Sequence, residues 1–293
     1  MKKLLLWIAA FVFGLVLLFG ACVAIVNSLV GDHDTLAGGD GVGVVELKGV
    51  IVDGQETIRQ LRAMKKDEHA KAVVFRVDSP GGVVGPSQEI YAAVKDLAKA
   101  KKVVVSMGSV AASGGYYVSA PASLIYANPG TITGSIGVLM KFSNLQGLMD
   151  KVGMKAFTIK TGKFKDTGSP ARAMTDEEKA MLQGVIDSTH GQFVKAVAQG
   201  RRLPEAQVRS IADGRIFSGE QALALKLVDR IGSMQDAIDE AARLGGIEGE
   251  PRLIRPAKKR GRALDYLVES AAQRLGVLSD SDSGVSVDYR LGW

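Results

Sequence analysis

A run of apolar residues that ends in a glycine loop occupies residues 72–82, with the sequence Ala-Val-Val-Phe-Arg-Val-Asp-Ser-Pro-Gly-Gly. Its first six residues are mostly branched or aromatic, which is typical of a strand buried on both faces of a parallel sheet. The Pro-Gly-Gly ending predicts a turn at the carboxyl end of that strand. Adjacent glycines leave backbone N–H groups unobstructed, so the loop is either a tight turn into the next helix or a place that stabilises an oxyanion.

Strand and helix patterns alternate on both sides of this run. The segments that favour strands are Val42–Ile51, Val103–Met107, Leu124–Ala127 and Met154–Ile159, and those with helical spacing are Gly54–Lys66, about Pro86 to Ala100, and a short segment from Ala112. Repeated strand–helix–strand units predict an α/β fold with a mainly parallel sheet covered by helices. The composition agrees with a globular domain, because 46% of the residues are hydrophobic and 23% are charged.

The second half of the chain is predicted to be mainly helical. Thr175 and the acidic residues that follow it form the cap and first turn of a long helix that ends near Gly200. Pro204, Ser218 and Ser233 mark further helix starts.

The N-terminal region has a different character. No charged residue occurs between Lys3 and Asp32, and the apolar run 4–31 would form roughly 42 Å of helix, more than the ~30 Å of bilayer hydrocarbon. Lysines precede the run and aspartates follow it, so we expect a single-pass helix in the cell (inner) membrane, with a cytoplasmic N-terminus and an extracytoplasmic catalytic domain. A cleaved signal peptide and lipidation at Cys22 are the alternatives.

These patterns predict four parts: a cytoplasmic tip with the membrane anchor over 1–31, a linker over 32–41, an α/β domain with a helical extension over 42–250, and a basic segment with a C-terminal tail over 251–293. The basic residues of 251–262 favour a solvated face, with contact to anionic lipid as the alternative, and we expect no nucleic acid outside the cytoplasm. One cysteine permits neither an intrachain disulfide nor a multi-thiolate metal site, and we expect no cofactor and no metal.

A serine lies in a second glycine-rich loop, which reads Ala-Ala-Ser-Gly-Gly-Tyr-Tyr over residues 111–117. Small neighbours at a strand-to-helix turn predict that Ser113 is exposed and accessible to an acyl substrate. The N–H of Gly114 would then lie next to an oxyanion formed on the carbonyl that Ser113 attacks. The alternative is a small-residue packing site at a helix start.

A nucleophilic serine needs a base, and the sequence offers few. The sequence has three histidines, His33, His69 and His190. None of them lies in a glycine-rich or strand-end loop. A lysine can replace histidine where burial keeps its amine neutral. Lys160, Lys163 and Lys165 lie together in residues 159–170, and their spacing does not choose among them.

Several motifs together resemble the short form of the signal peptide peptidase A family. They are Asp-Ser-Pro-Gly-Gly at 78–82, Ser-Met-Gly at 106–108, Ala-Ala-Ser-Gly-Gly-Tyr-Tyr at 111–117, Gly-Thr-Ile-Thr-Gly-Ser-Ile-Gly-Val at 130–138, Gly-Lys-Phe-Lys-Asp at 162–166 and Ser-Pro at 169–170. The resemblance covers about residues 42–245. It implies a crotonase-like fold, shared with the caseinolytic protease, and a membrane-anchored serine endopeptidase that degrades remnant signal peptides.

The resemblance also implies the roles of individual residues. Ser113 would be the nucleophile and Lys165 the general base of a Ser/Lys dyad, with Gly82 and Gly114 supplying the oxyanion N–H groups. The expected partners are copies of the chain itself in a homo-octameric ring, signal peptides and the lipid bilayer. Each active site would be shared between neighbouring copies. A crotonase-type acyl-CoA enzyme and a non-catalytic membrane scaffold of the same fold are the rival interpretations.

Overall fold

The computed structural model describes residues 7, 14, 39–256 and 288–290. The chain divides into two units, Met1–Gly39 and Asp40–Trp293, and the elements described below belong to the second. Apart from residues 7 and 14, the predicted membrane helix over 4–31 lies outside the described residues. Among the described residues, no helix is long and apolar enough to cross a bilayer. The four predicted parts of the chain therefore stay a prediction.

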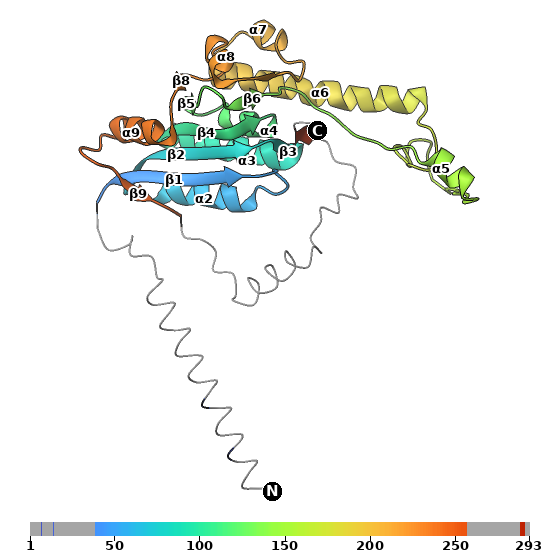
Figure 1. Cartoon of the computed structure of the whole chain (residues 1–293), viewed down its shortest axis with the longest axis horizontal. Helices are drawn as coiled ribbons and strands as arrows, with labels where there is room; N and C mark the ends of the chain where they lie inside the picture. The colour runs from blue at the N-terminus through green and yellow to red at the C-terminus, as the bar shows by residue number, and fades with distance from the viewer. Residues whose placement is uncertain (1–6, 8–13, 15–38, 257–287, 291–293) are drawn as a thin grey trace. The chain divides into compact units, whose positions relative to one another are not determined.

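A sheet of eight strands forms the centre of the second unit (Figure 1). The order along it is β7, β6, β4, β2, β1 and β9, with β5 paired to β4 and β8 paired to β5. All these pairings are parallel except that of β6 with β7, so the predicted mainly parallel sheet is confirmed. The strands are β1 (Gly41–Lys48), β2 (Ala70–Ser79), β4 (Lys102–Ala112), β5 (Leu124–Ala127), β6 (Ile132–Gly134), β7 (Ile216–Phe217), β8 (Arg230–Ile231) and β9 (Arg252–Ile254).

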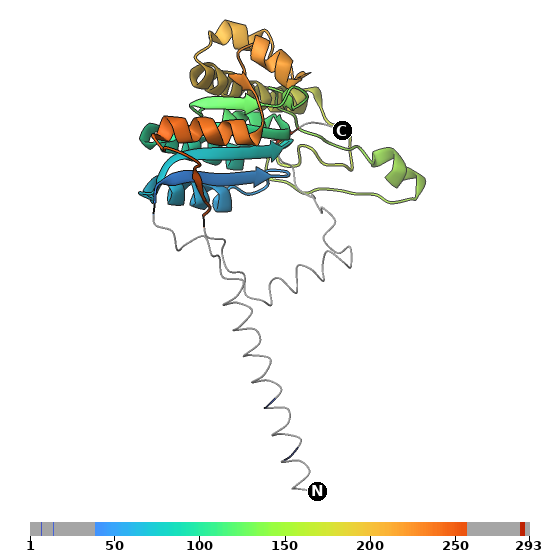
Figure 2. The ribbon, with the colours of Figure 1, turned by 60° about the vertical axis from the view of Figure 1, so that its left-hand side comes forward.

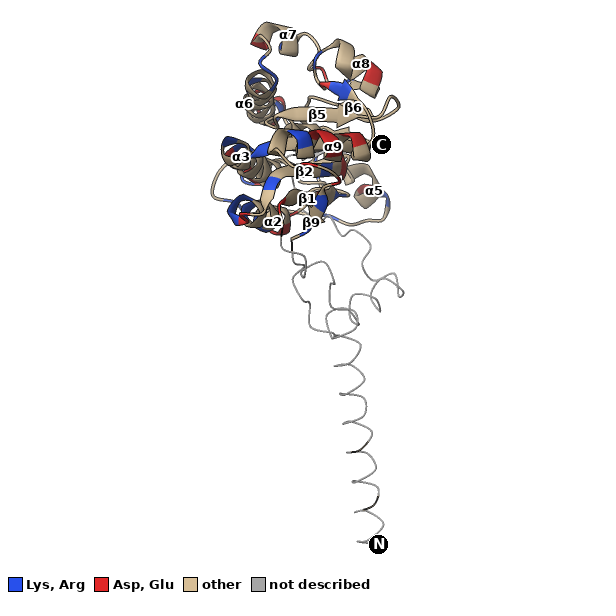
Figure 3. Cartoon of the chain, turned by 90° about the vertical axis from the view of Figure 1, so that its left-hand side faces the viewer, with Lys and Arg blue, Asp and Glu red and all other residues tan. Residues whose placement is uncertain are grey.

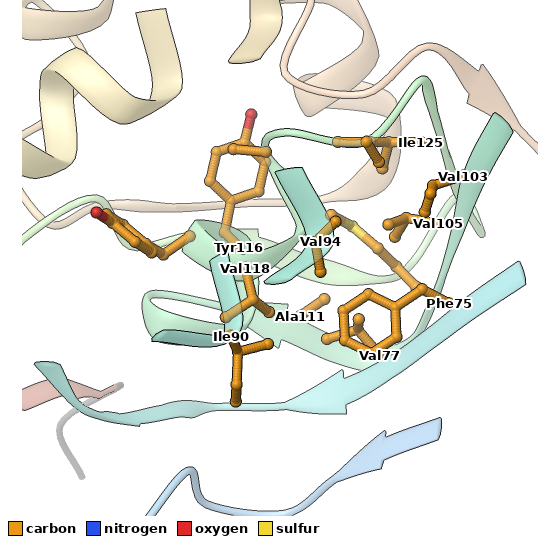
Figure 4. Close-up of a cluster of buried hydrophobic side chains, with 14 of the residues drawn as sticks. Phe75, Val77, Ile90, Val94, Val103, Val105, Ala111, Tyr116, Val118 and Ile125 are labelled. Carbon is orange, nitrogen blue, oxygen red and sulfur yellow. The ribbon is translucent and has the colours of Figure 1, made fainter. Parts of the chain in front are cut away.

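Helices cover the sheet from both sides (Figure 2). The helices of the unit are α2 (Gln55–Lys66), α3 (Val84–Ala100), α4 (Gly114–Ser119), α5 (Gln146–Lys151), α6 (Asp176–Arg201), α7 (Glu205–Arg209), α8 (Gly219–Ala224) and α9 (Met234–Gly245), and of these α5 lies away from the sheet (Figure 1). Alternate residues of β2 point to opposite faces, as the period of a strand requires. Phe75 and Val77 pack with α3 and α4 in the larger core (Figure 4), whereas Val74 packs against α9 in a smaller one.

Several predicted elements are confirmed, with boundaries that differ by a few residues. Thr175, Ser218 and Ser233 each cap a helix through a capping box, in which the side chain of the cap and the third helical residue exchange hydrogen bonds with the backbone. The strand predicted over Leu124–Ala127 has those bounds. The strand predicted over Val42–Ile51 is shorter, because β1 ends at Lys48.

The strand before Ser113 is longer than predicted. β4 continues beyond Met107 to Ala112, and α4 begins at Gly114 rather than at Ala112. The reason is an irregularity in its pairing with β2, where the register shifts between Val77 and Ser79. A glycine at position 108, within this bulge, made the strand look finished in the sequence.

The strand predicted over Met154–Ile159 is wrong. These residues form no strand, and the side chains of Phe157 and Ile159 are 89% and 95% exposed. They belong to the segment 139–175, here called the arm, which extends away from the sheet in both views and carries α5 (Figures 1 and 2). An apolar run forms a buried strand only where a neighbouring strand pairs with it, and the arm offers none among the described residues.

A second, two-stranded sheet lies beside the first glycine loop. It consists of β3 (Gly81–Val83) and β10 (Asp288–Arg290), which run antiparallel. On its other side β3 bonds the chain at Ile51, which donates its N–H to the carbonyl of Gly81 at 2.9 Å and accepts from the N–H of Val83 at 2.8 Å. The predicted loop at 78–82 is therefore mostly strand, because residues 78–79 end β2 and residues 81–82 begin β3.

Candidate active site

Ser113 occupies a strained turn between β4 and α4. Its backbone has φ 54° and ψ −117°, and it serves as the N-cap of α4. A positive φ costs a residue with a Cβ on the order of 1–3 kcal/mol, so the surrounding structure must impose it. The serine N–H donates to the carbonyl of Gly134 at 2.8 Å, and its own carbonyl accepts from the N–H of Tyr117 at 2.8 Å. A serine held in a strained strand-to-helix turn is typical of hydrolase nucleophiles.

The prediction that Ser113 is exposed is wrong in a single chain. The residue is only 1% exposed. The elements β3 and β10 both lie against α4, so the turn is enclosed rather than open.

Gly82 and Gly114 meet beside this serine. A Cβ placed on Gly114 would lie 3.1 Å from the backbone N of Gly82 and 2.8 Å from Oγ of Ser87. A Cβ on Gly82 would lie 2.1 Å from the carbonyl oxygen of Ile51. The clash with backbone means that Gly82 requires glycine, whereas a side chain on Gly114 would have to displace the Ser87 hydroxyl. Gly114 is also the first residue of α4, and the first N–H groups of a helix have no acceptor within it. The two loops predicted to supply oxyanion donors thus come together in one place.

Asp78 holds the irregular part of β4, a structural role that the sequence did not reveal. Its Oδ1 accepts the N–H of Val110 at 3.1 Å. A Cβ on Gly108 would lie 2.5 Å from the Asp78 Cγ, so the carboxylate occupies the space that this glycine leaves. The position of an acidic residue directly after a buried strand was the only signal in the sequence.

The three candidate lysines differ in their partners. Lys160 bonds the carboxylate of Asp166 and donates to the carbonyl of Lys163 at 2.8 Å. The amine of Lys163 lies 3.0 Å from Oε2 of Glu177. Lys165 is exposed, and its amine has no hydrogen-bond or ion-pair partner in the described part of the chain. Of the three, Lys165 is the one whose amine no carboxylate of the described residues engages.

Arg172 fixes the loop that carries Lys165 to the start of α6. Its Nε donates to Oδ2 of Asp166 at 3.0 Å and its Nη2 to Oδ1 at 2.8 Å. Its Nη1 donates to Oε2 of Glu178 at 2.9 Å and its Nη2 to Oε1 at 2.5 Å. Glu178 also accepts the N–H of Thr175 at 2.9 Å. The residue immediately after Lys165 is thereby tied to the first turn of the long helix.

This ion cluster shifts the titration of its members. The hydrogen bonds from Arg172, followed by that from Thr175, lower the pKa of Glu178 to about 2. Arg172, followed by Lys160, holds the pKa of Asp166 far below its usual range. Both carboxylates are therefore charged in the folded protein at neutral pH.

The lysine and serine halves of the predicted dyad are not joined within one chain. No hydrogen bond or ion pair connects the side chains of Ser113 and Lys165 among the described residues. Ser113 lies in the sheet-bound core, whereas Lys165 lies in the arm, which extends away from that core (Figures 1 and 2). Within one chain the two residues of the predicted dyad therefore lie apart.

Comparison with protein families identifies the chain. Residues 95–248 match the model of peptidase family S49, and residues 47–125 match the Clp protease model. The chain belongs to peptidase family S49. The expected resemblance to the signal peptide peptidase A group and the Clp-protease-like α/β domain are both confirmed.

Individual relatives of the chain are also named as proteases or peptidases. A Synechocystis protein named as a protease is 43% identical over 80% of this chain and 87% of its own length. An Enterococcus faecium protein named as a signal peptide peptidase is 36% identical over 82% of this chain and 70% of its own. A chloroplast protein of Arabidopsis thaliana, named as a serine protease, is 32% identical over 67% of this chain and 29% of its own. The S49 chain is thus a peptidase of a serine-type family.

Proposed function

We propose that this S49 chain is an endopeptidase in which Ser113 is the nucleophile and Lys165 of a neighbouring copy is the general base. The observation that carries the proposal is the contrast between two half-sites: a strained, enclosed serine beside two paired glycines, and an unpaired lysine on an exposed arm. Each half has what the other lacks. Only an assembly of copies would complete the site.

The proposed chemistry proceeds through an acyl-enzyme. Neutral Lys165 takes the proton of the Ser113 hydroxyl as its oxygen bonds the scissile carbonyl carbon, and the carbonyl oxygen becomes an oxyanion near the N–H groups of Gly82 and Gly114. Collapse of the tetrahedral intermediate breaks the C–N bond, and the lysine gives its proton to the leaving amine. Water then attacks the ester, the same amine takes its proton, and Ser113 is regenerated.

A lysine is a base only while its amine is neutral, and burial disfavours the charged form of an amine. The arm has the surface to achieve this burial on another copy. Leu148, Val152, Phe157 and Ile159 are all large, apolar and exposed in the single chain. Large apolar side chains exposed together on one segment are typical of a protein contact. We propose that it packs on the neighbouring protomer of a homo-octameric ring and encloses Lys165 there.

The edge of β3 is where a substrate would lie. Its antiparallel pairing with β10 demonstrates that this edge accepts an extended chain, with Tyr289 opposite Gly82. An extended substrate bound in the same way would have backbone hydrogen bonds without sequence-specific contacts, as in other cases of strand addition. Remnant signal peptides, which are rich in small and apolar residues, are the proposed substrates. The relative from Enterococcus faecium is named as a signal peptide peptidase.

The proposal includes the membrane. The apolar run 4–31 would anchor the protease in the cell membrane, with its catalytic domain on the extracytoplasmic side, close to signal peptides left in the bilayer. Protease accessibility in intact spheroplasts tests this arrangement. Digestion of the domain from outside supports it, and protection until the membrane is opened contradicts it.

A fluorophosphonate probe, which labels activated serines, tests the catalytic roles. Labelling of the full chain in detergent should be lost in Ser113→Ala, and peptidase activity should be lost in Lys165→Ala but kept in the control Lys163→Ala. Full labelling of Ser113→Ala would exclude Ser113 as the nucleophile, and no labelling of the wild-type chain would favour a non-catalytic scaffold. Activity that survives Lys165→Ala and is lost in Lys163→Ala would show that the base is the other lysine.

A further inference from the structure

A cavity of about 450 Å³ lies far from the proposed active site. Lys102, the first residue of β4, lines it, whereas Ser113 follows the last residue of the same strand, so the two sites lie at opposite ends of β4. The remaining wall comes from α3, the turn before β5 and the end of α6.

The cavity gathers positive charge that the described residues do not neutralise. Lys95, Lys102 and Arg202 all line it, and none has an ion-pair partner in that part of the chain. The single lining carboxylate, Asp229, is already engaged by Arg201 at 2.5 Å and by the N–H of Ile125 at 2.7 Å. Like charges around one hollow repel each other, and the field they share attracts an anion. Figure 3 shows the basic segments of α3, which contributes Lys95 to this wall.

Arg201 gives the cavity a rigid base. Its side chain is only 5% exposed, and its Nε is buried without a hydrogen-bond partner in the described part of the chain. Gly200 lets the helix end approach closely, since a Cβ there would lie 2.3 Å from the carbonyl oxygen of Ala120. The dipole of α6 accounts for cations at its own C-terminus. It does not account for Lys95 and Lys102, which come from other elements.

The lining also has an apolar side and neutral donors. Tyr91 and Pro121 offer apolar surface, and burial raises the pKa of Tyr91, so its hydroxyl stays protonated and able to donate. Pockets of about 300–1,000 Å³ suit small organic ligands. An inorganic anion alone would leave the apolar wall unused, and a single carboxylate would leave most of the unpaired charge uncompensated.

We infer that this cavity binds a phosphate monoester, whose dianionic group would lie among Lys95, Lys102 and Arg202 and whose organic part would lie against Tyr91 and Pro121. The phosphate group is the shared chemistry of two sources, a water-soluble ester and the headgroup of a lipid such as phosphatidic acid. The site is independent of the proposed catalysis, because none of its residues contributes to either half of the proposed dyad.

Calorimetric titration of the full chain in neutral detergent tests the inference, with phenyl phosphate as the soluble probe and detergent micelles with or without phosphatidic acid as the lipid probe. Lys95→Ala should weaken binding about tenfold, as expected for the loss of one charge-assisted contact. The matched control is Lys99→Ala, another exposed lysine of α3 that does not line the cavity. Higher salt should weaken binding to the wild type.

The outcomes distinguish a soluble ester from a lipid headgroup, and they include results that overturn the inference. Binding of phenyl phosphate that Lys95→Ala weakens and Lys99→Ala does not assigns the site to soluble esters. The same pattern with phosphatidic acid micelles alone assigns it to a lipid headgroup. Binding of neither probe, or equal loss in the two variants, overturns the inference. Activity towards peptides should be unchanged in Lys95→Ala, so failure here leaves the proposed protease function standing.

Discussion

The two halves of the proposed site are built in opposite ways. Ser113 lies at the end of a central strand, is 1% exposed, and is held in a strained conformation by backbone hydrogen bonds to β6 and α4. Lys165 lies on an exposed arm, where side-chain ion pairs around Arg172 rather than a core hold the loop. The residues of the proposed serine half thus all come from one chain. The lysine half is presented outward, as a part supplied to another copy would be.

The largest effect should come from breaking the serine half. Gly114→Ala places a methyl group 3.1 Å from the N of Gly82, which would push apart the two proposed oxyanion donors. We expect peptidase activity to fall on the order of 10²–10³-fold, the loss typical of one oxyanion donor. The control is Gly85→Ala, in the first turn of α3, where a Cβ meets nothing within 4 Å. Equal activity in the two variants would contradict the role of Gly114.

A smaller effect should come from loosening the lysine half. Arg172→Gln removes the charge that ties Asp166 to Glu178, so Lys165 would no longer be held in one place. We expect kcat to fall about 10-fold with little change in KM, and Arg172→Lys to restore part of it, since one charge returns without the paired geometry. Initial rates across a substrate range measure this split.

The matched control for Arg172 is Arg215→Gln, which breaks a similar pair with Asp213 outside the arm. Unchanged kcat in Arg172→Gln, or an equal loss in Arg215→Gln, would refute a positioning role for Arg172.

A fall in pH should destabilise the arm before the core, without any substitution. The folded-state pKa of Glu178, about 2, lies below its unfolded value near 4.3, so its contribution is complete above about pH 4.3 and is lost as the pH falls towards 2. Asp166 acts in the same direction. Pepsin cleavage within the arm should therefore increase between about pH 4 and pH 2, before the core is cut.

Glu178→Gln should move the onset of arm cleavage to higher pH, because one of the two carboxylates can no longer pair. Asp213→Asn removes a carboxylate whose pKa Arg215 likewise lowers to about 2, but outside the arm, and should leave arm cleavage unchanged. Cleavage that begins in the core, or an arm unaffected by Glu178→Gln, would contradict the ion cluster as the support of the lysine half.

The smallest effect concerns the edge of β3. Because β10 pairs with it, deletion of residues 288–293 should free the edge for substrate and raise the initial rate on a peptide about 2- to 5-fold, as expected for a weak intramolecular competitor. A synthetic peptide of those residues should inhibit the truncated enzyme competitively. A rate that stays the same or falls on truncation would show that β10 lies away from the substrate path.

The sequence predicted the strands and the two glycine loops of the serine half, and it chose Lys165 only through resemblance; the catalytic roles stay predictions. Branched apolar runs and glycine loops specify parallel strands and the turns at their ends, so the sequence alone was enough to expect the two glycine loops at the carboxyl ends of their strands, and the resemblance added their shared role. The burial of Ser113 could not be predicted, because it depends on β3 and β10, which come from distant parts of the chain.

The strand predicted in the arm was wrong for a physical reason. Met154–Ile159 has the composition of a buried strand, but it lies in solvent within one chain. Hydrophobic patterns indicate that a segment will be covered and do not indicate what covers it. The same limit explains why spacing left three lysines open, since the pairing of Lys160 with Asp166 and of Lys163 with Glu177 depends on the folded loop.

Co-expression of Ser113→Ala and Lys165→Ala chains tests the central claim most directly. Each variant alone has no complete site, whether the dyad forms within one chain or between two. In mixed assemblies a chain with intact Ser113 can receive Lys165 from its neighbour, so about a quarter of the sites should be complete if copies assemble at random around a ring. Recovery of peptidase activity near that fraction is the predicted result. Activity no higher than that of either variant alone, in assemblies shown to contain both chains, would contradict a site shared between copies.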